Sequence, residues 1–195
     1  MHLGSEEEMQ QRLASMPLHH TMRGLFFNSV LDVVRQLEDE NAVTHCLEST
    51  GETRYLDFFS YPTSTYVRLL YTAANLLSTR YGGFEGALRA MGARTILKFL
   101  DSAAGKALQL VVEGNPQRLL NNIPVIHKMV MRGGECSMKW ASPTGGRLTI
   151  ERISAPAPFI EGALQAVFDA THVRGAKVAS RQIGPLDVEF EVSWR

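Results

Sequence analysis

The feature that most constrains this chain is a change in hydrophobic periodicity at the pair Gly133-Gly134. Before this pair, apolar residues recur at every third or fourth position, as in amphipathic helices. After it, apolar and polar residues alternate, most clearly in the last segment, where the apolar positions are Leu186, Val188, Phe190, Val192 and Trp194. Such alternation predicts a sheet with one buried face and one wet face. We therefore expect an α+β fold, in which an N-terminal helical bundle packs on a C-terminal four-stranded antiparallel sheet of β-β-α-β-β order.

Capping residues, prolines and glycines set the expected bounds of the elements. Helices are expected at about residues 5–14, 22–37, 42–48, 62–81, 84–91, 95–111, 116–131 and 159–170. Gly92 is expected to end the helix that begins at Phe84. Strands are expected at about 135–140, 147–151, 176–183 and 186–194. We expect residues 1–195 to form a single domain, with a helical part at about 5–133 and a sheet part at about 134–195.

Charge and composition exclude several classes of function. Of the 195 residues, 45% are hydrophobic, which is enough to build a full core. Lys and Arg together number 20, as do Asp and Glu, and this balance argues against binding to nucleic acid or to a charged membrane surface. The two cysteines, Cys46 and Cys136, belong to no zinc or disulfide pattern. The start of the chain lacks a signal peptide, so we expect a soluble, cytoplasmic protein.

His127 is the first candidate for a functional side chain. On an ideal helix it shares an apolar face with Leu120, Ile123 and Val130. A histidine in that position is an axial ligand to haem iron, a core residue bonded to a backbone carbonyl, or the relic of a lost site. The helix context alone favours the core interpretation, because histidine is often partly buried.

Recognised catalytic patterns are missing from the sequence. No GxSxG, HExxH or Cys/His nucleophile signature occurs, and His45 beside Cys46 is too short a signal to indicate one. We therefore expect a protein that is not an enzyme. Tyr61 and Tyr66 lie in an aromatic-rich middle segment and can line a ligand cavity, although ordinary core packing explains them equally simply.

Two stretches carry a family resemblance: the helical segment Pro124-Val125-Ile126-His127 and the terminal β-β-α-β-β unit. With these features the chain resembles the haem-nitric oxide/oxygen binding (H-NOX) domain and its relatives, from about Met22 to Trp194. Those relatives include vinyl-reductase-type ligand-binding domains and Golgi transport-particle subunits. Phe59-Ser60-Tyr61-Pro62 and Arg89-Ala90-Met91-Gly92 make the chain resemble still more closely an uncharacterised paralogous family of myxobacteria, whose function is not established.

The resemblance has direct implications for haem. It places His127 at the position of the iron ligand. Haem-binding members also carry a Tyr-x-Ser-x-Arg motif that holds the haem propionates, and the matching stretch here runs from Arg152 to Pro156, where only Ser154 fits. Arg152 is an alternative partner for one propionate. Because buried carboxylates without partners are costly, we expect no cofactor, with haem held by His127, Arg152 and Ser154 as the alternative.

Four functions remain, in order of preference. The first is a non-catalytic small-ligand-binding or sensing domain in signalling or regulation, which holds an apolar ligand between the helices and the sheet or binds a protein partner there. Its expected pocket residues are Tyr61, Tyr66, Leu120, Ile123, Met138, Trp140 and Ile150. The second is a haem-based gas sensor with His127 as proximal ligand, and the third a homodimeric interaction module with a filled core. The fourth is an enzyme. We expect any signal to be read out by a separate partner.

Overall fold

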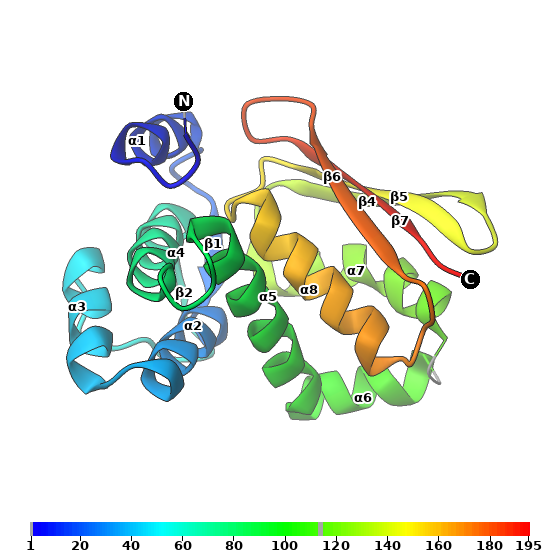
Figure 1. The fold of residues 1–195 in the computed structure, drawn as a ribbon, viewed down its shortest axis with the longest axis horizontal. Coiled ribbons are helices and arrows are strands. Elements are labelled where there is room, and N and C mark those ends of the chain that lie inside the picture. The colour runs from blue at the N-terminus through cyan, green and yellow to red at the C-terminus, as the bar shows by residue number, and fades with distance from the viewer. Residues whose placement is uncertain (1, 113–114) are drawn as a thin grey trace.

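The computed structural model describes residues 2–112 and 115–195 and confirms the α+β class (Figure 1). The described residues form eight helices and two antiparallel sheets. The helices are α1 (Glu6–Ser15), α2 (Gly24–Leu37), α3 (Glu40–Thr50), α4 (Thr63–Leu77), α5 (Phe84–Asp101), α6 (Ala103–Val112), α7 (Pro116–Val130) and α8 (Ala157–Ala170). The strands are β1 (Thr21–Arg23), β2 (Ser60–Pro62), β3 (Met131–Arg132), β4 (Glu135–Ser142), β5 (Gly145–Glu151), β6 (Lys177–Gln182) and β7 (Val188–Ser193).

The larger sheet has the strand order β4-β5-β7-β6, and α8 connects β5 to β6. Leu148 of β5 lies opposite Phe190 of β7, and Ile150 opposite Val188. All four side chains are buried, and they pack in one cluster with apolar residues of α7 and α8. The alternation of the last strand therefore places its apolar residues on the face that the helices cover.

A second, three-stranded sheet of order β2-β1-β3 lies within the part that the sequence predicted to be helical. In it, Met22 lies opposite both Tyr61 and Met131. The predictions that a helix begins at Met22 and that another extends to Met131 were wrong at these ends, because strands of two or three residues are too short to show a period. The small sheet joins the start of α2, the start of α4 and the end of α7.

Gly92 does not end a helix, as the sequence predicted; α5 continues through it to Asp101. A Cβ atom at Gly92 would lie closer to the carbonyl oxygen of Phe159 in α8 than the 3.0 Å that real Cβ atoms keep. A Cβ atom at Gly162 of α8 would meet the carbonyl oxygen of Arg89 in α5 in the same way. The two glycines allow the backbones of α5 and α8 to approach each other closely.

Helix α5 lies between the two halves of the molecule (Figure 1). It packs against α2 and α4 on one side and against α8 on the other. The N-terminal helices form one core cluster around Phe27, Leu70 and Met91, whereas the larger sheet forms another with α7 and α8.

Candidate functional site

Two adjoining apolar cavities lie beside His127, with volumes of about 170 Å³ and about 160 Å³. We call them the first and the second cavity. They share a wall of apolar side chains from α2, α5, α7, α8 and β5, and His127 lines both. The shared residues are Phe26, Ile96, His127, Val130, Ile150, Ile160 and Ala163. The first cavity extends toward the sheet cluster and α6, and the second toward α4 and the small sheet.

His127 presents a polar atom to this apolar surrounding. Its Nε2 is buried and has no hydrogen-bond partner among the described residues. Burial, with a smaller effect from the charge of Lys128, lowers the pKa of His127 below the ordinary 6.5. The ring is therefore neutral at pH 7. The alternative of a core histidine bonded to a backbone carbonyl is not what the structure shows, because no described carbonyl accepts a bond from this side chain.

Two of the residues that line the second cavity, Thr95 and Tyr66, carry hydroxyl groups. Thr95 of α5 is buried, and its Oγ1 also has no hydrogen-bond partner among the described residues. Tyr66 of α4 is buried too, and burial raises the pKa of its hydroxyl. Sequence reasoning proposed Tyr66 but missed Thr95, because a single threonine within a helix follows no pattern that marks a ligand site.

The structure brings together only some of the pocket residues that the sequence proposed. Ile150 lines both cavities, Ile123 the first and Tyr66 the second. Leu120 lines neither cavity, because it is fully buried in the sheet cluster.

The three other proposed pocket residues lie outside the linings of the two cavities. Tyr61 of β2 packs on Phe27, with ring centroids 5.5 Å apart, and its hydroxyl accepts a hydrogen bond from the backbone N–H of Leu56. Met138 and Trp140 lie on β4, where Trp140 Nε1 donates to Asn121 Oδ1 at 2.8 Å.

The residues at the expected haem clamp do not fit two propionates. The guanidinium of Arg152 lies 3.8 Å from the carboxylate of Glu135, at an exposed position outside both cavities. Ser154 lines the second cavity, but its hydroxyl donates to Met131 Sδ. Neither cavity has an Arg or Lys in its described lining, so buried carboxylates would lack a cationic partner. His127 Nε2 suits an iron ligand, whereas the rest of the site does not suit haem.

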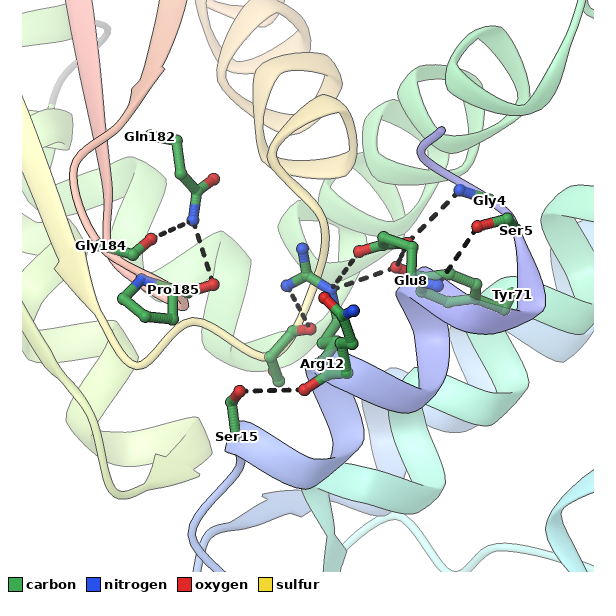
Figure 2. A network of polar contacts seen from close by, with 11 residues as sticks. Gly4, Ser5, Glu8, Arg12, Ser15, Tyr71, Gln182, Gly184 and Pro185 are labelled. Atoms are coloured by element: carbon green, nitrogen blue, oxygen red, sulfur yellow. Dashed lines mark hydrogen bonds and ion pairs between the residues drawn. The ribbon is translucent and has the colours of Figure 1, made fainter. Parts of the chain in front are cut away.

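A polar network attaches α1 to α4 and to the segment that precedes α8 (Figure 2). Arg12 Nε lies 3.3 Å from Glu8 Oε1 and 3.1 Å from the Tyr71 hydroxyl, which itself donates to Glu8. Arg12 Nη1 also donates to the backbone carbonyl of Ser154, at 3.5 Å. The network thus links α1, α4 and the segment that precedes α8.

Two further searches of the described residues were negative. No group of three or more His, Cys, Asp or Glu side chains in the described ranges is placed to hold a metal ion. Among the described helices, none has both the length and the apolar character needed to cross a membrane.

Comparison with known proteins gives a family and a fold. The family model described as "Protein of unknown function (DUF2378)" matches residues 17–195. No curated protein sequence matches the chain. Among solved structures, the Fe(II) unliganded H-NOX protein from K. algicida is 17% identical, with a TM-score of 0.72 over 89% of this chain and 97% of that chain.

Two other H-NOX structures agree with this result. The H-NOX protein from S. oneidensis in the Fe(II)NO ligation state is 15% identical, with a TM-score of 0.68 over 89% of this chain and 99% of that chain. A mutant H-NOX from T. tengcongensis is 14% identical, with a TM-score of 0.68 over 89% of this chain and 98% of that chain. The expectation of an H-NOX-like fold is confirmed.

Proposed function

Since this chain belongs to the DUF2378 family and has the H-NOX fold, we propose that it is a non-catalytic domain that binds a small, mainly apolar molecule in the two cavities beside His127. The observation that carries this proposal is the pair of apolar cavities at the junction of helices and sheet. Binding there would serve sensing or regulation, and a protein partner would read it.

The size of the cavities supports a small ligand. An apolar cavity of roughly 150 Å³ stays dry and binds benzene or xenon. The first and second cavities, at about 170 Å³ and about 160 Å³, are each of that size. Typical pockets for drug-sized ligands are larger, at roughly 300–1,000 Å³. We therefore propose a ligand with the bulk of a single six-membered ring in either cavity.

The alternatives have less support. A haem-based gas sensor is favoured by the unpartnered Nε2 of His127 and by neighbours whose structures contain Fe(II), in one case with NO. It is disfavoured by the lack of a propionate clamp and by cavities far smaller than a four-pyrrole ring system. An interaction module without a ligand predicts a filled core, and the two cavities do not agree with that prediction.

Benzene binding, followed as a shift in melting temperature, tests the proposal. A ligand at 100 times its Kd stabilises the folded state by about 2.7 kcal/mol. Ala163 lines both cavities, so Ala163→Leu should fill part of the space and abolish the shift. Ala170→Leu, at an exposed position of the same helix, is the matched control and should keep it. A wild-type protein that benzene does not stabilise, or an equal shift in Ala163→Leu, would refute the proposal.

A haemin titration separates the haem alternative from the proposal. We expect no Soret band that depends on His127. A band that forms with the wild-type protein and is lost in His127→Ala would instead establish haem binding through this histidine.

A further inference from the structure

The small sheet of β2, β1 and β3 has two unlike sides. In an antiparallel sheet, residues directly opposite each other point to the same side, and successive residues of a strand point to opposite sides. Met22 lies opposite both Tyr61 and Met131, so these three residues share one side. Met22 and Met131 line the second cavity, which places this side toward the proposed ligand site. The other side faces away from the cavity.

The outer side of the small sheet carries positive charge. Thr21 lies opposite Arg132, and Arg23 lies opposite Ser60, so these four residues share the outer side. Together with Lys128, from the last turn of α7, they line a groove of about 430 Å³. Arg23, Lys128 and Arg132 are all exposed.

No carboxylate neutralises these cations. The described lining of the groove contains no Asp or Glu, and none of its three cations forms an ion pair with a described residue. Arg23 instead donates a hydrogen bond to the backbone carbonyl of Phe58 at 2.7 Å, which leaves its charge uncompensated. By contrast, the exposed Arg89 is paired with both Glu85 and Glu161. The groove therefore attracts the carboxylates of a partner.

Exposed apolar side chains flank the same groove. Phe58, whose carbonyl binds Arg23, is 89% exposed, and Phe59, which precedes Ser60 of β2, is 62% exposed. Met129 lines the groove and is 67% exposed. Exposed apolar side chains that gather in one place with a polar rim mark interaction sites. Aromatic residues, Met and Arg are also the residue types enriched at protein–protein interfaces.

The shape of this face favours a peptide segment over a membrane. The volume of the groove, about 430 Å³, lies within the range of roughly 300–1,000 Å³ that is typical of pockets that enclose a ligand. A short segment of a partner can enter such a groove, whereas a flat membrane surface would touch only its rim. An acidic segment can place carboxylates beside the cations and an apolar side chain against Phe58 and Phe59.

We infer that the outer side of the small sheet, with the last turn of α7, docks an acidic segment of a partner protein. Its carboxylates contact Arg23, Lys128 and Arg132, and an apolar side chain packs on Phe58 and Phe59. The inference rests on the proposed function only for the role of this partner, which would read the ligand. The docked segment would lie directly behind the sheet that forms part of the wall of the second cavity.

Binding of a labelled peptide to the full chain tests this inference. The probe is a short fluorescein-labelled peptide with one leucine among aspartates and glutamates, and fluorescence anisotropy in low salt follows its binding. We expect a dissociation constant below about 1 mM. Binding should weaken at about 200 mM salt, because screening reduces the attraction between exposed charges. An analogue with asparagine and glutamine in place of the acids should not bind.

Two triple variants locate the site of binding. The first removes the cations of the groove, as Arg23→Ala, Lys128→Ala and Arg132→Ala. It should bind the peptide at least about tenfold more weakly, since each lost contact between exposed charges accounts for up to about fivefold. The matched control removes the same charge from exposed positions on or beside the larger sheet, as Lys139→Ala, Arg174→Ala and Lys177→Ala. The control should bind the peptide as the wild-type protein does.

A single substitution tests the apolar contact. Phe58→Ser should weaken binding of the leucine peptide severalfold, because the leucine loses an apolar surface against which to pack. The same variant should bind an analogue with serine in place of leucine as tightly as the wild-type protein does. Phe58 is exposed, so its replacement should leave the melting temperature unchanged.

The outcomes separate this inference from the proposed function. A peptide that does not bind, or that binds both triple variants equally, would overturn the inference, whereas benzene binding would leave the proposed function standing. Vesicles of phosphatidylserine and phosphatidylcholine test the alternative occupant. If they bind through the three cations of the groove and the peptide does not bind, the face belongs to a membrane and the inference is overturned. If the peptide binds as expected and benzene does not, the docking face stands and the proposed function falls.

Discussion

The close approach of α5 and α8 makes the stability of this fold sensitive to a single methyl group at Gly92. In an isolated helix, Gly→Ala stabilises by about 1 kcal/mol, because alanine loses less conformational entropy on folding. At Gly92 the added Cβ would meet the backbone carbonyl of Phe159, which cannot rotate away as a side chain can. The two helices must separate, and the walls that they contribute to the second cavity must move with them.

The size of the loss follows from these opposing effects. Overpacking a well-packed contact costs about 1–3 kcal/mol, and a clash with backbone belongs at the upper end. Subtracting the gain in helix propensity leaves a net destabilisation of about 2 kcal/mol for Gly92→Ala. For a chain of this size, that corresponds to a fall in melting temperature of about 4–8 °C.

Urea denaturation of four variants tests this reasoning. Gly92→Ala and Gly162→Ala should each lower the unfolding midpoint, and the double variant should lose less than the sum, because the first substitution already separates the helices. Ala93→Gly, at the neighbouring position of α5, calibrates the propensity difference and should cost about 1 kcal/mol. A Gly92→Ala protein as stable as the wild type would show that α5 and α8 have room for the methyl group.

Three other predictions concern the buried polar groups. Thr95→Val should raise the free energy of unfolding by about 1–2 kcal/mol, since it removes an unpartnered hydroxyl, whereas Thr171→Val should lower it; thermal melts of both variants measure the difference. Because the pKa of His127 is lowered in the folded state, the associated stability is fully present above pH 6.5 and is lost as pH falls below 6.5. Urea midpoints measured from about pH 8 to about pH 5 should therefore fall less steeply in His127→Gln than in the wild-type protein. Part of the acid sensitivity should persist, because the pKa of His20 is lowered as well, chiefly by burial. Cys46 is buried and its pKa is raised to about 12, so iodoacetamide at about pH 8 should label it only when the protein unfolds; rapid labelling under native conditions would contradict the packing described.

Sequence periodicity predicted the elements that bury a regular face. The alternation that ends in Val188, Phe190 and Val192 predicted the last strand because each apolar side chain faces the helices. The same reasoning failed at Gly92. A glycine that ends a helix and a glycine that lets another helix backbone approach look alike in the sequence. It failed again at Met22, because a strand of three residues has no repeat to detect.

The sequence pointed to a residue of the candidate site only where that residue type is unusual among its neighbours. His127 stood out because histidine on an apolar helix face demands an explanation, and the structure places it between two cavities. Thr95 gave no such signal, since threonines that bond to their own helix are common. Only the packing of α4, α5 and α7 around one space shows that its hydroxyl has no partner, and that arrangement depends on contacts far apart in the sequence.

The attachment of α1 implies that parts of this molecule open independently. Helix α1 has no buried residue and is held by partly buried apolar contacts and by the Arg12 network, whereas α4 has fully buried residues such as Leu69 and Leu70. Amide hydrogens of α1 should therefore exchange with solvent through local opening, and those of α4 only through global unfolding. A ligand in the second cavity would slow exchange in α4 and α5 while leaving α1 nearly unchanged, so the pattern of protection would show where a molecule binds before its position is seen directly.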